Sequence, residues 1–122
     1  MKTVLQTGQV SELANTFGLL ADPTRLSIVI VCMDAERSAG DIAERLGLSA
    51  SLTSHHLRLL RAARILRSER RGKQVFYAMA DACVSSVIRI MIDHIFTHGH
   101  DNANQATEEP PSADHNPTEM RL

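Results

Sequence analysis

Two predicted helices separated by a three-residue turn do most to constrain the fold of this chain. Apolar residues recur at helical spacing in residues 38–46 and again in residues 50–61. Gly47, which can adopt the left-handed conformation that ends a helix, begins the turn, and Ser49 ends it as a good N-cap for the next helix. A helix, a short turn with glycine and a second helix form the pattern of a helix-turn-helix.

Helices are also predicted on the N-terminal side of this motif. Apolar residues between positions 4 and 20 form the stripe of a first helix, which ends near Ala21. A second helix spans about residues 23–34, where Asp22 is suited to be the N-cap and a proline takes the first helical position. This helix is apolar nearly all round, as expected of a central buried helix, and we interpret its Cys32 as a core residue.

A β-hairpin is predicted directly after the helix-turn-helix. Residues 65–70 and 73–79 alternate in part between apolar and polar side chains, and a basic Arg-Gly pair separates them. The sequence therefore predicts a mainly α fold with a β-hairpin wing, a winged helix-turn-helix, within a domain over residues 1–98. Residues 99–122 contain almost no apolar side chains, and we expect them to form a disordered, acidic, His-containing tail.

Basic side chains are concentrated in the second half of this motif. The formal net charge of the chain is −1, yet residues 49–74 contain a single acidic residue, Glu69. The seven basic residues of that segment are Arg58, Arg61, Arg64, Arg67, Arg70, Arg71 and Lys73. A basic segment in a chain of almost zero net charge indicates a polyanionic partner at one face of the molecule.

The predicted helix over residues 50–61 has the side chains of a helix that reads DNA. Thr53, Leu57 and Leu60 fall on one stripe and are expected to face the core. The opposite stripe carries hydroxyl, imidazole and guanidinium groups, which can contact base edges or phosphates in a major groove, while basic residues of the wing can contact the backbone. We predict that double-stranded DNA is contacted by Ser51, Ser54, His55 and Arg58 of this helix and by Arg70, Arg71 and Lys73 of the wing.

The last predicted helix, over residues 81–98, carries four potential metal ligands. They are Asp81, Cys83, His94 and His98. His94 and His98 are four residues apart, so both imidazoles are expected on one face of the helix. Cys83 and His94 are eleven residues apart, roughly 16 Å along an α-helix, and an ion with bonds of about 2.0–2.3 Å cannot join them within one chain. A shared site therefore needs a second, antiparallel copy of the helix.

Together these features resemble the ArsR/SmtB family of bacterial metal-sensing repressors over about residues 19–98. The matching stretches are Leu20-Ala-Asp-Pro-Thr-Arg-Leu26, Ser38-Ala-Gly-Asp-Ile-Ala43, Leu46-Gly-Leu-Ser-Ala-Ser-Leu-Thr-Ser-His-His-Leu-Arg-Leu-Leu60 and Arg70-Arg-Gly-Lys-Gln-Val-Phe-Tyr77. The resemblance implies a winged-helix homodimer joined through its first and last helices. It also implies a repressor that binds an inverted-repeat operator and is released when a divalent metal binds between the paired last helices.

The last-helix metal site of this family has the pattern Asp-x-His, ten residues, then His-x-x-His or His-x-x-Glu. By resemblance, Asp81 matches the first ligand, Cys83 stands where a histidine is usual, and His94 matches the second histidine. Thr97 occupies the last position, and His98 is the nearest substitute. Further candidate ligands are His100, Asp101 and His115. Thiolate, imidazole and carboxylate donors suit Zn²⁺ first, and also Co²⁺ or Cd²⁺, whereas more nitrogen donors from the tail favour Ni²⁺.

Other interpretations of these residues stay open. Asp81 is also a natural N-cap for the last helix, and a single Cys83 is commonly a small core residue. The first alternative function is a repressor that senses oxidants or persulfides through Cys32 and Cys83. A metal-buffering protein that uses the C-terminal histidines is a less favoured alternative, because it leaves the basic segment unexplained.

The remaining features of the sequence predict the cellular context. The N-terminus has no basic stretch followed by an apolar run, and no apolar segment reaches the ~18 residues needed to span a membrane. We therefore expect a cytoplasmic protein without a membrane partner, whose two cysteines are reduced. No catalytic pocket can be assembled from the sequence, and we do not expect an enzyme.

Overall fold

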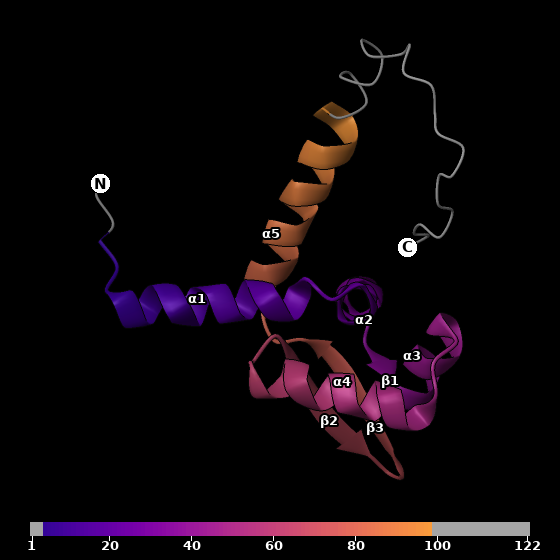
Figure 1. Cartoon of the computed structure of the whole chain (residues 1–122). Coiled ribbons are helices and arrows are strands. Elements are labelled where there is room, and N and C mark those ends of the chain that lie inside the picture. Colours follow the sequence, from indigo (N-terminus) through magenta and orange to yellow (C-terminus); the bar gives the residue numbers. More distant parts are fainter. Residues whose placement is uncertain (1–3, 99–122) are drawn as a thin grey trace. The chain divides into compact units, whose positions relative to one another are not determined.

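The computed structural model describes residues 4–98, so the predicted tail lies outside the described residues. The chain divides into two compact units, Met1–Ala82 and Cys83–Leu122. The elements in chain order, labelled in Figure 1, are α1 (Thr7–Leu20), α2 (Pro23–Asp34), β1 (Arg37–Ser38), α3 (Ala39–Leu46), α4 (Ala50–Ala62), β2 (Leu66–Arg71), β3 (Gln74–Met79), α5 (Ala82–Asp93) and η1 (His94–His98).

Helix α1 begins later than predicted and exposes its apolar stripe. The backbone of Gln6 is extended, and its N–H donates to the Gln9 side chain at 2.9 Å in a capping box, so the residues before it are not helical. The prediction that the helix included the apolar residues at positions 4 and 5 was therefore wrong. The helix has no buried residue, and Val10, Leu13 and Phe17 are each about half exposed.

Helix α2 has the predicted bounds and forms the centre of the core. The Asp22 carboxylate accepts a hydrogen bond from the Arg25 backbone N–H at 2.9 Å, which confirms the predicted N-cap. The core comprises Ile28, Val29 and Cys32 of α2, Ile42 of α3, Leu57 and Leu60 of α4, and Ile65 and Leu66 at the start of the hairpin.

No single helix in residues 4–98 is long and apolar enough to cross a membrane, although α1 and α2 together, bent by 85° at their junction, reach that length and composition.

The helix-turn-helix is confirmed in its caps and its turn. Ser38 caps α3, and Ser49 caps α4 by accepting a hydrogen bond from the Leu52 backbone N–H at 3.0 Å. Gly47 has a φ of 67° and ends α3, with the Leu48 N–H donating to the Ala43 carbonyl at 2.9 Å. The predicted turn therefore forms because each helix end is satisfied by residues within five positions of it.

The wing contains one strand more than predicted and a turn shifted by one residue. The sheet is antiparallel in the order β1-β3-β2, and the short strand β1 had not been predicted. Arg71 pairs with Gln74, so the turn is Gly72-Lys73 and not the predicted Arg71-Gly72. Gly72 has a φ of 65°, which glycine adopts without strain and which favours it as the first of two turn residues. Arg71 is thereby placed in strand β2.

The last helix changes its hydrogen-bonding pattern at His94. It is α-helical through Asp93 and π-helical over His94–His98, so the predicted single α-helix to residue 98 was wrong. In a π-helix the hydrogen bonds run from residue i to i+5, and the α-helical spacing used to place His94 and His98 on one face does not apply there. The Thr97 hydroxyl donates to the Asp93 carboxylate at 3.1 Å across this change.

Candidate DNA-binding face and metal ligands

Helix α4 separates core-facing from solvent-facing side chains as the sequence predicted. Thr53, Leu57 and Leu60 are at most 1% exposed, and the Thr53 hydroxyl donates to the Ser49 carbonyl at 2.8 Å. The four residues of this helix predicted to contact DNA, Ser51, Ser54, His55 and Arg58, are all exposed. Their placement leaves them available to a groove, and their contact with DNA stays a prediction.

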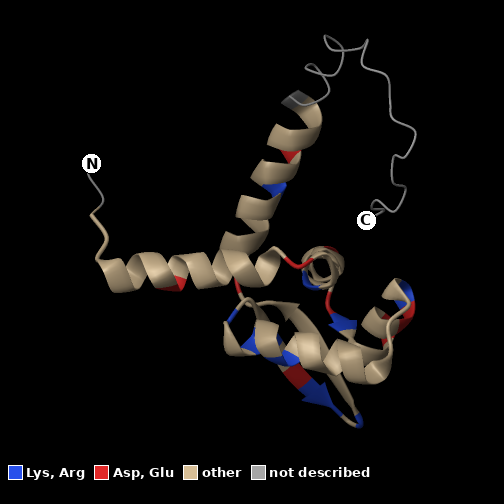
Figure 2. Ribbon diagram, in the orientation of Figure 1, with Lys and Arg blue, Asp and Glu red and all other residues tan. Residues whose placement is uncertain are grey.

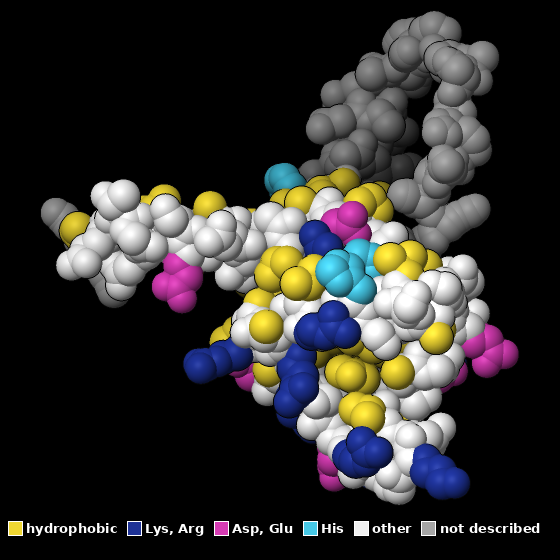
Figure 3. Space-filling model, turned by 60° about the horizontal axis from the view of Figure 1, so that its bottom comes forward, with side chains coloured by type: hydrophobic (Ala, Val, Ile, Leu, Met, Phe, Trp, Pro, Cys, Tyr) yellow, Lys and Arg dark blue, Asp and Glu magenta, His cyan; other side chains and the backbone are white. Residues whose placement is uncertain are grey.

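The basic residues of the helix-turn-helix and wing form one exposed set. All seven basic side chains between residues 49 and 74 are exposed. Figure 2 shows them along α4 and the hairpin, and Figure 3 shows Lys and Arg side chains together with histidine on the face that comes forward in that view. Among the described residues, Arg71 is the member of this set that forms ion pairs. The other six can therefore meet phosphates without first breaking an internal ion pair.

The exposed side chain of Arg71 contacts three neighbouring side chains. Its Nη2 lies 2.8 and 2.9 Å from the two carboxylate oxygens of Glu36 and 3.0 Å from an oxygen of Glu69. Its guanidinium carbon lies 4.7 Å from the centre of the Phe76 ring, within cation–π distance. Because the Arg71 guanidinium donates hydrogen bonds to the carboxylates of Glu69 and Glu36, its pKa is raised above the usual value. This arrangement could not be predicted from the sequence, because Glu36 is 35 residues away from Arg71.

A buried histidine on α4 was not predicted from the sequence. His56 is 8% exposed, and its Nδ1 lies 3.4 Å from Nη1 of Arg25. Arg25 also donates from Nε to the Leu19 carbonyl, at 2.9 Å, so it links the end of α1 to α4. Burial lowers the pKa of His56, the Asp22 charge raises it, and the charges of Arg25 and His55 lower it further. The helical spacing that identified Thr53, Leu57 and Leu60 as core residues also includes position 56.

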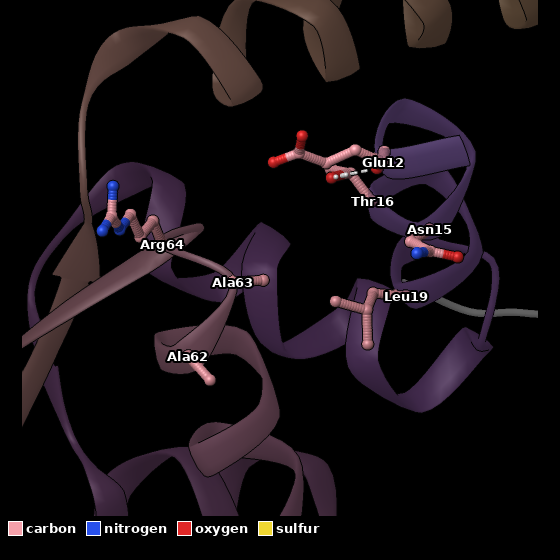
Figure 4. Close-up of a pocket in the computed structure, with 7 residues that line it drawn as sticks. All are labelled: Glu12, Asn15, Thr16, Leu19, Ala62, Ala63 and Arg64. Atoms are coloured by element: carbon pink, nitrogen blue, oxygen red, sulfur yellow. Dashed lines mark hydrogen bonds between the residues drawn. The ribbon is translucent and has the colours of Figure 1, made fainter. Parts of the chain in front are cut away.

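A polar cavity of about 420 Å³ lies between α1 and the end of α4. Figure 4 shows its lining, which consists of Glu12, Asn15, Thr16, Leu19, Ala62, Ala63 and Arg64. Arg64 has a φ of 63°, and the N–H groups of Arg64 and Ile65 donate to the carbonyls of Arg61 and Leu60 at 2.9 and 3.0 Å. This is the Schellman arrangement that also ends α3, but here an arginine occupies the left-handed position that usually holds glycine.

The predicted metal ligands occupy both ends of the last helix. Asp81 precedes α5, Cys83 is its second residue, and His94 begins the π-helical segment, and all three are exposed. His98 ends that segment, and His100, Asp101 and His115 lie outside the described residues. Within residues 4–98 of one chain, no group of three or more His, Cys, Asp or Glu side chains is placed to hold a metal ion. The proposed ligand set stays a prediction.

Comparison with known proteins identifies the family. Residues 22–68 match the family described as "Bacterial regulatory protein, arsR family". These residues include α2, the helix-turn-helix and the start of the wing. A "Transcriptional repressor SmtB homolog" from Synechocystis is 35% identical over 92 residues, which is 75% of this chain and 70% of the relative.

Two solved structures show how the fold compares. The solution structure of apo-NmtR is 28% identical, with a TM-score of 0.67 over 80% of this chain and 82% of that one. The homodimeric winged helix-turn-helix DNA-binding domain Mb0332 from Mycobacterium bovis has a TM-score of 0.68 over 80% of this chain and 93% of that one, at 21% identity. The fold is therefore a winged helix-turn-helix, and the chain belongs to the ArsR/SmtB family of transcriptional repressors.

Proposed function

We propose that this repressor is metal-responsive, that it binds an inverted-repeat operator as a homodimer, and that a divalent metal ion releases it from DNA. Zn²⁺ is the first candidate inducer, with Co²⁺, Cd²⁺ and Ni²⁺ as alternatives. The ligands proposed are Asp81 and Cys83 of one protomer with His94 and His98 of its partner. The observation that carries the proposal is the separation of donor groups along the last helix.

That separation is set by helical geometry. Cys83 to Asp93 is continuous α-helix, which advances roughly 15 Å at about 1.5 Å per residue. One ion with bonds of about 2.0–2.3 Å cannot span this distance. Two antiparallel copies of the helix would place the Cys83 end of one chain beside the His94 end of the other. Symmetry would then give two equivalent sites per dimer.

The donor set fits a borderline metal ion. Cys83 supplies a sulfur ligand, His94 and His98 supply nitrogen, and Asp81 supplies oxygen. Four such donors suit the tetrahedral coordination that Zn²⁺ adopts in proteins, and the sulfur favours Cd²⁺ over Ni²⁺. When bound, the ion would crosslink the last helices of the two protomers. We propose that the crosslinked dimer fits the operator less well, so that operator DNA weakens metal binding by the same factor.

Two exposed apolar stripes support a homodimer. Val10, Leu13 and Phe17 of α1 recur at helical spacing and are 48–54% exposed. In the second unit, Val87, Ile90 and Met91 of α5 recur in the same way and are 44–66% exposed. Contiguous exposed apolar residues of this kind mark a protein interface, and each stripe is expected to pack against a second copy of the chain. The homodimeric structure of Mb0332 is consistent with this assembly.

The decisive experiment measures operator release by metals. Fluorescence anisotropy of a duplex from the protein's own promoter region is recorded after chelation, with Zn²⁺, Co²⁺, Ni²⁺, Cd²⁺ and Cu⁺ added in turn. At least one divalent ion is expected to release wild-type protein but not the Cys83→Ser or His94→Asn variant, while both variants still bind DNA without metal. Cys32→Ser is the matched control and is expected to respond as wild type does. If no metal releases the wild-type protein, the proposal is wrong.

The alternative of thiol sensing is weakened by the environment of Cys32. This residue is 3% exposed, and burial raises the pKa of its thiol to about 11, with a smaller lowering effect from Arg37. A reactive cysteine needs an accessible thiolate, which burial opposes here. Cys83 is exposed, so it alone of the two is accessible to an oxidant. A response to persulfide that survives chelation and is lost in Cys83→Ser would support the alternative.

A metal-buffering function is separated from repression by the DNA itself. A buffer has no reason to prefer an inverted repeat, whereas the proposed dimer places two recognition helices about 34–36 Å apart on adjacent half-sites. Gel-shift titrations with the inverted repeat and with a scrambled duplex of the same composition compare the two functions. Equal affinity for both duplexes would favour the buffer.

A further inference from the structure

An ion pair connects the wing of this protein to the segment that follows α2. Glu36 occupies that segment, and its carboxylate accepts two hydrogen bonds from Nη2 of Arg71 in strand β2, at 2.8 and 2.9 Å. Glu69 accepts a third at 3.0 Å, and the Phe76 ring lies against the guanidinium. A guanidinium in contact with two carboxylates and an aromatic ring is confined in orientation far more than one exposed to water.

The segment that holds Glu36 is itself rigidly placed. The next residue, Arg37, donates from Nε to the Val31 carbonyl of α2 at 2.6 Å and lies 3.4 Å from the Asp41 carboxylate of α3. Arg37 also pairs with Tyr77 in the sheet. Residues 36 and 37 therefore connect the central helix, the first helix of the helix-turn-helix and the wing. An ion pair to this segment fixes the wing relative to the DNA-reading elements.

We propose that Arg71 is a positioning residue of the wing and not a phosphate contact, and that its ion pair with Glu36 sets the angle at which Arg70 and Lys73 approach DNA. This inference rests on operator binding by the proposed repressor and is independent of its inducer. Glu36 and Glu69 together outweigh the single positive charge of Arg71, so this part of the wing offers no net positive charge to a phosphate. Arg70 and Lys73 are exposed and form no ion pair among the described residues.

The two possible roles of Arg71 predict opposite effects of removing Glu36. If Arg71 contacted a phosphate, Glu36 would compete with DNA for the guanidinium, and Glu36→Ala would tighten operator binding. If Arg71 positions the wing, Glu36→Ala releases the wing and weakens binding although a negative charge has been removed. We expect a weakening of roughly three- to tenfold at every salt concentration. Glu44→Ala is the matched control, since it removes an exposed acidic residue of α3 that forms no ion pair among the described residues, and it should tighten binding slightly.

The dependence of affinity on salt gives a second, quantitative test. Each lost phosphate contact lowers the slope of log K against log salt by about 0.9, or about 1.8 for a symmetric dimer. Arg70→Ala is expected to lower the slope by that amount. The double variant Glu36→Ala/Arg71→Ala, which keeps the net charge, is expected to weaken binding and leave the slope unchanged. Its affinity should equal that of Glu36→Ala, because both remove the same link.

Hydrogen exchange of the free protein tests the same link without DNA. Backbone amides of residues 69–74 are expected to exchange faster in Glu36→Ala and Arg71→Ala than in wild type or Glu44→Ala. The inference is overturned if Glu36→Ala tightens operator binding, if the double variant lowers the salt slope as Arg70→Ala does, or if wing exchange is unchanged. A repressor that binds its operator but ignores metals would refute the proposed inducer and leave these three results interpretable.

Discussion

The buried imidazole of His56 makes the stability of the DNA-binding unit depend on pH in a direction that can be tested. An arginine side chain has only hydrogen-bond donors, so Nδ1 of His56 must accept from Arg25 and carry no proton. Protonation of His56 would remove this acceptor and place a second positive charge beside the guanidinium. The structure therefore requires the neutral imidazole.

The sign of the effect follows from the lowered pKa of His56 in the folded protein. At pH values between the lowered pKa of the folded protein and the ordinary histidine pKa of about 6.5, His56 binds more protons in the unfolded chain than in the folded protein. The stability associated with neutral His56 is thus fully present above about pH 6.5 and is lost as the pH falls through the window below it. Because His56 binds a single proton, it can change the free energy of unfolding by at most about 1.4 kcal/mol per pH unit.

The assay is urea unfolding at fixed protein concentration, in the presence of a chelator, at several values between about pH 8 and pH 5.5. Wild-type protein is expected to lose more free energy of unfolding over the acidic part of this range than His56→Gln, whose amide can accept from Arg25 but cannot titrate. His55→Gln keeps the His56 imidazole and should keep its loss of stability on acidification, shifted slightly to higher pH because the charge of His55 is the smallest of the effects on the pKa of His56. At pH 8, His56→Leu is expected to cost about 1 kcal/mol more than His56→Gln, because it removes the acceptor.

Two results would refute this reasoning. If His56→Gln loses as much stability as wild type on acidification, the neutral imidazole is not what titrates. If the difference between the two slopes exceeds the limit for a single proton, a conformational change and not the Arg25–His56 contact dominates.

Three further predictions concern helix ends and assembly. Ser49→Ala removes the N-cap of α4 and is expected to lower the free energy of unfolding by about 1 kcal/mol, whereas Ser51→Ala, on the exposed face of the same helix, should change it by less than about 0.5 kcal/mol in urea unfolding. Arg64→Gly relieves the left-handed backbone of a non-glycine residue and should stabilise the protein by about 0.5–1 kcal/mol, and a loss of stability would contradict the strain. Phe17→Asp places a charge in the exposed stripe of α1, so sedimentation should show a monomer, in contrast to the dimer expected of the wild type; a variant that stays a dimer would exclude α1 from the interface.

Much of the fold could be predicted from the sequence, because the decisive signals are local. The caps at Asp22 and Ser49 and the left-handed Gly47 depend on residues within a few positions, and each was predicted correctly, whereas Ser38, predicted as the first helical residue, is the N-cap of α3. Which side chains of α4 are buried follows from the 3.6-residue period of its core-facing residues. The same period also includes position 56, so the burial of His56 could have been predicted but was not.

The proposed metal site could be predicted only as a set of potential ligands. The order and spacing of Asp81, Cys83 and His94 are visible in the chain, as is the length that separates the last two. The change to a π-helix at His94 could not be foreseen, because a helix that contains apolar residues at regular spacing gives no sign of where its hydrogen bonds shift from i+4 to i+5.

By itself, then, the sequence determined the ends of α2, α3 and α4 to within one residue and the face of α4 that meets solvent, since these depend on interactions between near neighbours in the chain. Only the tertiary structure decided what the polar side chains do. It joined Arg71 to Glu36 and Arg25 to His56, across 35 and 31 residues, and added the short strand β1 to the wing. Contacts between such distant residues leave no periodic signal, because they arise when the packing of the core brings separate elements together.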